Sequence, residues 1–173
     1  MKVVFAGDSI TASASWEAMV PGSETLNVAV PGFTTADLLT QLPSITALAP
    51  DVLVLLIGTN DLGGLNRNPD DIADDIATIV QRLTQDLPAT RIVLNSIMPR
   101  DRYWTPSIRR INVRLATLAA HQQLIYLDTW PALASNEGTG LNPLYLLDDG
   151  FDVHLNHLGY EAWQRILEPV LST

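Results

Sequence analysis

Apolar and polar positions alternate along the chain with two periods, and these periods predict strands and helices in turn. Five stretches are rich in apolar residues in the manner of strands. Uninterrupted Val, Ile and Leu, as in VLVLLIG, are typical of parallel strands covered on both faces. The pattern therefore predicts five strands, at Val3–Ala6, Thr25–Val28, Val52–Ile57, Arg91–Asn95 and Leu124–Leu127.

Between these strands the apolar residues recur every three to four positions, as they do on one face of a helix. Asn68 is a suitable N-cap and Pro69 a suitable first residue for a helix that ends before Pro88. A stretch at Ala36–Leu48 is also helical in pattern, and Pro43 predicts a kink or a split in it. Two more helices are expected, one from Thr105 that buries Ile108, Ile111, Leu115 and Leu118, and one after Asn156 that buries Leu158, Trp163, Ile166, Leu167 and Val170.

This alternation of strands and helices indicates a parallel sheet with right-handed crossovers. Five strands with helices on both faces predict an α/β fold, a flavodoxin-like three-layer α/β/α sandwich. The length of 173 residues suits one domain spanning residues 1–173. The irregular stretch from Thr129 to Val153 is too long for a simple connection, so it is a candidate functional loop.

The composition excludes several classes of function. The net charge is -9 and no Lys/Arg cluster is present, so we expect no nucleic-acid partner and no stable membrane association. The chain has no cysteine, which excludes disulfides, thiol nucleophiles and cysteine-bound zinc. No secretory signal pattern opens the sequence, and we expect a cytoplasmic protein.

Polar residues follow the predicted strands at the point where each strand ends. Ser9 follows the first strand, Gly32 the second and Asn60 the third, while His154 precedes the last helix. Ligands of open parallel sheets bind at the carboxyl ends of the strands, so these residues are expected at one edge of the sheet.

These residue types fit acyl transfer, which needs a hydroxyl nucleophile, an imidazole base and donors for the oxyanion. Ser9 is the candidate nucleophile and His154 the candidate base. The backbone N–H groups of Ser9 and Gly32, with the side-chain amide of Asn60, are the candidate oxyanion hole. Asp8 is expected to organise the turn by accepting backbone N–H bonds, and Asp61 to cap the segment behind it.

Four segments, GDSI, NVAVPG, IGTND and DVHLNHLGYEAW, resemble the four blocks of the SGNH hydrolases, also called the GDSL esterase/lipase family. They come in the order and spacing of that family and span residues 7 to 163. The resemblance implies a flavodoxin-like sandwich and a serine hydrolase that needs no metal or cofactor. It assigns Ser9 as the nucleophile, His154 as the base, and Gly32 and Asn60 to the oxyanion hole.

Two departures from the family pattern concern the glycine turn and the acid. Ala29 stands where the family usually has a first glycine, and Pro31 precedes Gly32. The family usually places Asp three residues before the histidine, where this chain has Phe151. Asp152 is the predicted acid of the triad because it needs no loop excursion to reach His154. Asp149 is the alternative, if the two residues after Phe151 are an insertion.

The predicted function is hydrolysis of a small-molecule carboxylic ester through an acyl-enzyme, with a short acyl chain. Thioesterase, lysophospholipase and acyltransferase activities would use the same residues. A non-catalytic module such as a receiver domain shares the strand pattern. A receiver, however, needs an acidic pair after the first strand and a late lysine, and this chain has no lysine after Lys2.

Overall fold

A five-stranded parallel sheet lies at the centre of the molecule, with its strands in the order β2-β1-β3-β4-β5. The computed structural model describes residues 1–172; the predicted domain boundary at Thr173 lies outside them. Each strand begins and ends within one residue of its predicted position. The strands are β1 (Lys2–Gly7), β2 (Glu24–Asn27), β3 (Val52–Leu56), β4 (Arg91–Asn95) and β5 (Ile125–Leu127).

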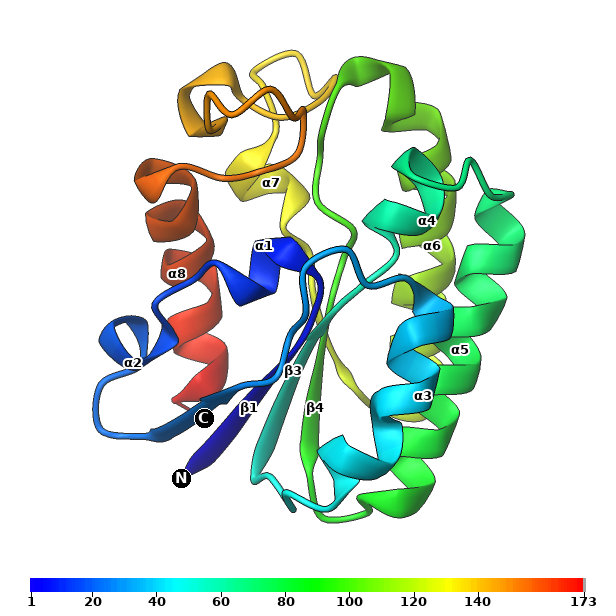
Figure 1. The fold of residues 1–173 in the computed structure, drawn as a ribbon, viewed down its shortest axis with the longest axis vertical. Helices are drawn as coiled ribbons and strands as arrows, with labels where there is room; N and C mark the ends of the chain where they lie inside the picture. Colours follow the sequence, from blue (N-terminus) through cyan, green and yellow to red (C-terminus); the bar gives the residue numbers. More distant parts are fainter. Residues whose placement is uncertain (173) are drawn as a thin grey trace.

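Helices cover both faces of the sheet, which confirms the predicted three-layer sandwich (Figure 1). One face packs against α3 (Thr35–Thr46), α5 (Pro69–Asp86) and α6 (Thr105–Gln122). The other packs against α8 (His157–Leu171) and the shorter α1 (Ser9–Ala12), α2 (Trp16–Met19) and α7 (Trp130–Leu133). Three further short elements are α4 (Thr59–Gly63), η1 (Arg102–Trp104) and η2 (Pro143–Tyr145).

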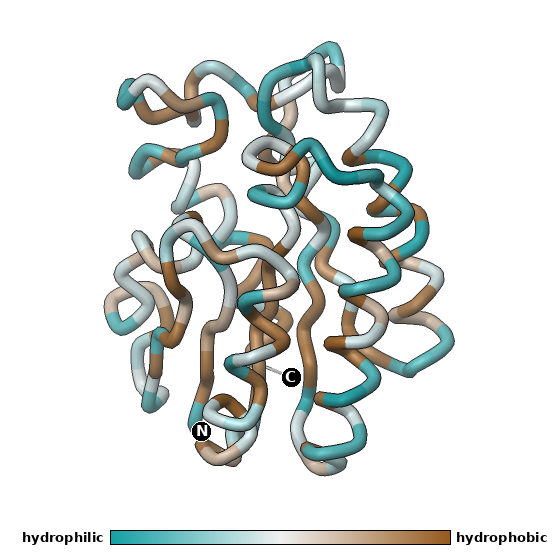
Figure 2. The backbone as a smooth tube through the Cα atoms, turned by 45° about the vertical axis from the view of Figure 1, so that its right-hand side comes forward, coloured by the Kyte–Doolittle hydropathy of each residue, from teal (hydrophilic) through white to brown (hydrophobic). Residues whose placement is uncertain are grey.

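Side chains alternate between the two cores along each central strand. In β1, Val4 and Ala6 face the first core, whereas Val3 and Phe5 face the second. All four are fully buried. Figure 2 shows the same division as brown apolar strands inside and teal polar positions on the outer surfaces of the helices. Burial on both faces thus accounts for the continuous apolar runs in the sequence.

One prediction about the helices is wrong in detail, and another is settled only in part. Pro43 does not split its helix, since α3 continues through it to Thr46, and the predicted kink stays a prediction. Leu158 is 40% exposed and not buried. It lies in the first turn of α8, whose buried face runs instead through Gly159, Trp163 and Leu167.

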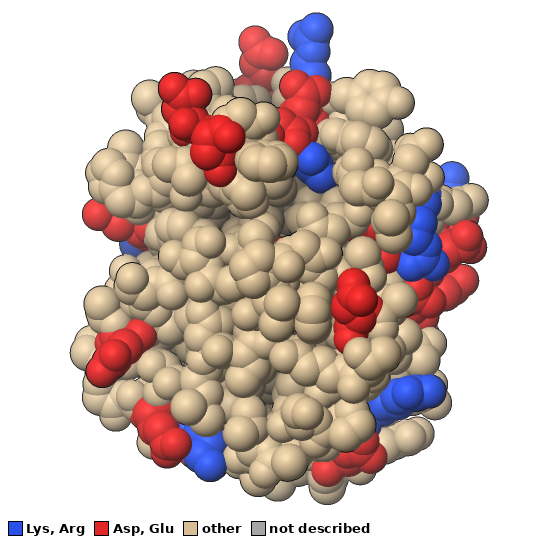
Figure 3. Space-filling model, viewed as in Figure 1, with Lys and Arg blue, Asp and Glu red and all other residues tan. Residues whose placement is uncertain are grey.

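The carboxyl ends of the strands all point to one edge of the molecule, the upper edge in Figure 1. Acidic side chains gather around this edge, above a broad face with few charges (Figure 3). The long segment 129–153 also lies there and contains α7 and η2. Among the described residues, no helix is both long and apolar enough to cross a bilayer.

Candidate active site

Ser9 lies at the tip of β1, one of the inner strands of the sheet, after a turn that requires glycine. Gly7 has φ +154°, and a Cβ atom there would lie 2.1 Å from the carbonyl oxygen of Leu56 in β3. The chain then turns at Asp8, whose Oδ1 accepts a 3.0 Å hydrogen bond from the N–H of Ile10 and caps α1. The prediction for Asp8 is confirmed, and Ser9 becomes the first residue of α1.

Asp8 is buried directly beneath the nucleophile candidate. Its Oδ2 has no hydrogen-bond partner within residues 1–172. Burial raises the pKa of this carboxyl from 3.8 to about 7, against the opposing effects of the Ile10 hydrogen bond and the charge of His154. Burial therefore favours the neutral form of this carboxyl.

Ser9, His154 and Asp149 form one chain of hydrogen bonds. The Oγ of Ser9 lies 3.0 Å from Nε2 of His154, and Nδ1 of His154 lies 2.6 Å from Oδ2 of Asp149. The hydrogen bond to His154 holds the pKa of Asp149 below its usual range. A carboxylate at Asp149 fixes the imidazole proton on Nδ1, so Nε2 is free to accept the serine proton.

The prediction that Asp152 contacts His154 is wrong. Its carboxylate accepts two hydrogen bonds from Arg100, one from Nε at 3.0 Å and one from Nη2, and a third from the N–H of Asp101 at 3.2 Å. Burial raises the pKa of Asp152, but Arg100 and the backbone donor together outweigh it and hold this pKa below its ordinary value. Closeness in sequence was misleading, because the segment from Gly150 to Val153 makes the excursion that lets the more distant Asp149 reach the ring.

The rival base, His157, is exposed at the first position of α8, as expected for a residue beyond the edge of the site.

Gly32 and Asn60, the other candidates for the oxyanion hole, line the same cavity as Ser9. Gly32 has φ +84° in the turn after β2, and no atom lies within 4 Å of the position a Cβ would take, so the backbone is open to a ligand. One amide hydrogen of Asn60 is donated to the carbonyl of Phe33 at 2.9 Å. The other amide hydrogen remains for a ligand. Ser9 opens α1, where its N–H has no intrahelical acceptor.

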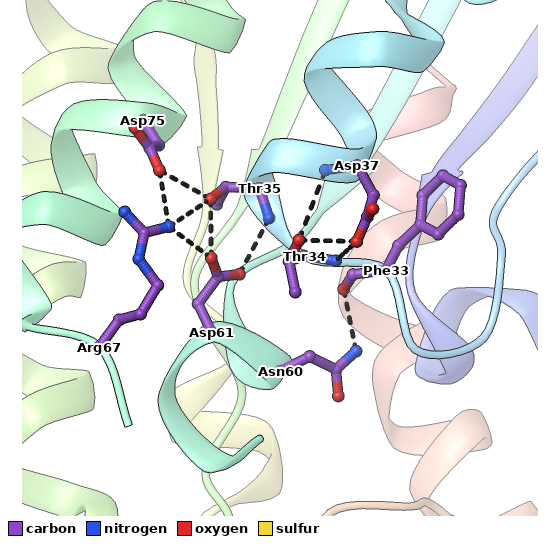
Figure 4. A network of polar contacts seen from close by, with 8 residues as sticks. All are labelled: Phe33, Thr34, Thr35, Asp37, Asn60, Asp61, Arg67 and Asp75. Atoms are coloured by element: carbon purple, nitrogen blue, oxygen red, sulfur yellow. Dashed lines mark hydrogen bonds and ion pairs between the residues drawn. The ribbon is translucent and has the colours of Figure 1, made fainter. Parts of the chain in front are cut away.

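A buried polar network joins the two turns that carry Gly32 and Asn60 (Figure 4). The carboxylate of Asp61 accepts hydrogen bonds from the N–H of Thr35 at 2.9 Å and its hydroxyl at 2.7 Å. Arg67 bridges Asp61 and Asp75, at 2.8 and 2.7 Å. Asp61 thus supports Asn60, as expected, by tying α4 to the start of α3, whereas the expected cap of its own segment is not formed.

Ser9, Gly32, Asn60 and His154 line one cavity of about 360 Å³, and the topology thus brings together the residues that the sequence placed at one edge. Pro31, Gly63, Gly64, Arg100, Phe151 and Val153 complete its walls. Phe151 is 62% exposed, and the centroid of its ring lies 5.2 Å from the centroid of the His154 ring. Arg100 lines this cavity, and its partner Asp152 comes from a loop about fifty positions later in the chain.

Comparison with known proteins bears on this geometry directly. Residues 5–162 match the model of the GDSL-like lipase/acylhydrolase family. The chain belongs to the GDSL-like lipase/acylhydrolase family. As a member, it is a carboxylic ester hydrolase, and its fold and its four motif segments are those that the resemblance implied.

Relatives and solved structures agree with this assignment. The chain is 28% identical over 181 residues to platelet-activating factor acetylhydrolase IB subunit alpha1 of Bos taurus, covering 98% of this chain and 75% of the relative. A GDSL-like lipase from Bacteroides thetaiotaomicron superposes with a TM-score of 0.83 at 22% identity, over 99% of this chain and 87% of the other. An acetylxylan esterase from Geobacillus stearothermophilus superposes with a TM-score of 0.78 at 19% identity, over 99% of this chain and 94% of the other.

Proposed function

We propose that the protein hydrolyses carboxylic esters with short acyl chains through an acyl-enzyme on Ser9. The observation that carries the proposal is the continuous chain from Ser9 through His154 to Asp149, at the wall of a cavity that also presents Gly32 and Asn60. Hydroxyl, imidazole, carboxylate and oxyanion donors are the full set of groups that acyl transfer needs.

In the first half-reaction, the Oγ of Ser9 bonds to the acyl carbon while its proton moves to Nε2 of His154. The negative charge on the former carbonyl oxygen is stabilised by the N–H groups of Ser9 and Gly32 and the amide of Asn60. His154 then gives its proton to the leaving oxygen as the ester C–O bond breaks. In the second half-reaction, a water molecule gives a proton to Nε2 of His154 and bonds to the acyl carbon. His154 then returns the proton to the Oγ of Ser9 as the acid leaves, and Asp149 keeps the ring oriented throughout.

Two observations favour a short acyl chain. The cavity holds about 360 Å³, and Arg100, Phe151 and Val153 are among its walls, so its size suits a small group beside Ser9. The curated relative at 28% identity is named as an acetylhydrolase. A cytoplasmic location stays a prediction.

Hydrolysis of p-nitrophenyl esters from acetate to palmitate tests the proposal with wild type and Ser9→Ala. We expect kcat/KM to be highest for acetate or butyrate and Ser9→Ala to lose at least about 10³-fold. Ser15→Ala is the matched control, because Ser15 precedes α2 and makes no side-chain cap hydrogen bond. Equal hydrolysis by wild type and Ser9→Ala would refute the nucleophile, and a maximum at palmitate would refute the short acyl chain.

A further inference from the structure

Arg100 occupies the junction between the two loops that complete the candidate active site. It follows β4, and its side chain is only 10% exposed. Nε and Nη2 bind the two carboxylate oxygens of Asp152, while Nη1 donates to the carbonyl oxygen of Thr59 at 3.1 Å and to its hydroxyl at 3.3 Å. All three guanidinium nitrogens are therefore engaged within the protein.

The two partners of Arg100 lie next to residues of the site. Thr59 directly precedes Asn60, and Asp152 lies between Asp149 and His154. Gly63, at the end of α4, packs flat against the guanidinium, where a Cβ atom would come within 2.3 Å of Nη1. The buried side chain of Arg100 thus connects the start of α4, which carries Asn60, to the loop that carries Asp149 and His154.

The Arg100–Asp152 pair also supports the unusual spacing of the acid and the base. Five positions separate Asp149 from His154, so the segment between them must leave the direct path and return. Phe151, within that excursion, is exposed. Asp152 is its polar anchor to the body of the protein, through Arg100 and the N–H of Asp101.

Asp152 compensates the charge of Arg100, and this bears on whether Arg100 binds the substrate or positions other residues. A bidentate pair with Asp152 leaves neither a free carboxylate nor a free cation for a substrate, although Arg100 lines the cavity. The planar fork of the guanidinium matches two carboxylate oxygens at once, which the ammonium of lysine cannot do. Arg100 therefore acts through geometry.

We propose that Arg100 is a positioning residue that, through Asp152 and Thr59, sets His154 and Asn60 at their working distances from Ser9. This inference rests on the proposed function for its catalytic consequence, but the position of the imidazole can be measured without a substrate. Misplacement of a catalytic group by about 1 Å can cost about 10²-fold in rate.

The kinetic test compares Arg100→Gln, Arg100→Lys, Asp152→Asn and the double variant Arg100→Gln/Asp152→Asn on p-nitrophenyl acetate. We expect each single variant to lose about 10- to 100-fold in kcat with KM changed less than about threefold. Arg100→Lys should not rescue activity, since it keeps the charge and loses the fork. The double variant should be no worse than the poorer single variant, because both changes break one interaction.

Arg110→Gln is the matched control. Arg110 also binds both oxygens of one carboxylate, that of Asp70, but this pair joins the exposed surfaces of α5 and α6 away from the cavity. Its loss should leave kcat within about twofold of wild type. Urea unfolding of every variant separates lost positioning from lost folded protein.

Proton NMR of the histidine rings tests the positioning directly. The Nδ1 proton shared by His154 and Asp149 should give a low-field signal in wild type that is lost in His154→Ala, in Arg100→Gln and in Asp152→Asn, but kept in Arg110→Gln. If wild type cleaves no ester yet this pattern appears, the proposed function fails and the positioning role stands. The role is overturned if folded Arg100→Gln and Asp152→Asn keep the signal, keep wild-type kcat, or raise KM alone.

Discussion

The two sides of Ser9 are built in different ways. On the oxyanion side, Gly32 lies in the turn after β2, and Asn60 lies in α4, shortly after the buried strand β3. The fully buried carboxylate of Asp61 ties α4 to the start of α3. On the histidine side, His154 and its acid come from a long segment after β5. That side depends on individual side-chain contacts.

This difference teaches which part of the site the fold supplies. Strand ends of a parallel sheet converge by topology, so the oxyanion side follows from the strand order. The position of His154 is set instead by hydrogen bonds to Asp149 and by the Arg100–Asp152 pair. Variants on the histidine side should therefore affect catalysis more than stability, and variants in the Asp61 network the reverse.

The largest difference in activity is expected between variants of two carboxylates in the same loop. Asp149→Asn should lower kcat by about 10³- to 10⁴-fold, because an amide at this position no longer fixes the Nδ1 proton of His154. Asp152→Asn makes the same chemical change three residues away and should lose only about 10- to 100-fold. Steady-state kinetics on p-nitrophenyl acetate measures both, and a greater loss for Asp152→Asn would reverse the assignment of the acid.

On the oxyanion side, Asn60→Ala removes one donor from the developing charge. We expect kcat to fall by about 10²- to 10³-fold with little change in KM, since the missing hydrogen bond strengthens only in the transition state. Parallel kinetics of wild type and Asn60→Ala, with circular dichroism to confirm the fold, gives this value. An unchanged kcat would remove Asn60 from the oxyanion hole.

The support beneath that donor should show itself chiefly in stability. Asp61→Asn weakens buried hydrogen bonds to Thr35 and Arg67, so the free energy of unfolding should fall by about 1–3 kcal/mol in urea denaturation. Asp74→Asn is the control, because Asp74 forms an exposed ion pair with Arg114, and it should stay within about 0.5 kcal/mol of wild type. Equal effects of the two changes would contradict a structural role for Asp61.

The stability of the protein should depend on pH with opposite signs at Asp8, beneath Ser9, and at Asp149, on the histidine side. Burial raises the pKa of Asp8 from 3.8 to about 7, so over this interval the folded state holds a proton that the unfolded chain releases. The contribution of Asp8 to the free energy of unfolding is therefore present below pH 3.8 and falls as the pH rises to about 7.

Asp149 works in the opposite direction, because His154 lowers its pKa: its stabilising contribution is present above the ordinary pKa of 3.8 and is lost as the pH falls. Urea titrations from pH 4 to 8 test the contribution of Asp8 by comparing wild type with Asp8→Asn. The free energy of unfolding should decline less with rising pH in Asp8→Asn than in wild type. An equally steep decline in both proteins would assign the pH dependence to another group.

The sequence alone carried the fold and the oxyanion side of the site. Apolar-rich stretches placed all five strands to within one residue, and the polar segments that follow three of them contain Ser9, Gly32 and Asn60. Such features are local, and the topology of a parallel sheet turns them into a shared site without further information.

The acid could not be read in the same way. Asp149 and Asp152 lie in one loop, and the alternative acid, Asp149, contacts His154, because Arg100, about fifty positions earlier, binds the carboxylate nearer in sequence. The Asp61–Thr35–Arg67 network was missed for the same reason, since its members are brought together only by helix packing. Contacts between distant side chains leave no periodic signal in a sequence.

Covalent labelling with a fluorophosphonate, located by peptide mass spectrometry, tests the central claim most directly, because it reads the reactivity of Ser9 without assuming a substrate. We predict one adduct on Ser9 in wild type, none in Ser9→Ala, and labelling at least about 10²-fold slower in His154→Ala. Wild type that stays unlabelled, or carries its adduct on another residue that Ser9→Ala still labels, would contradict the account.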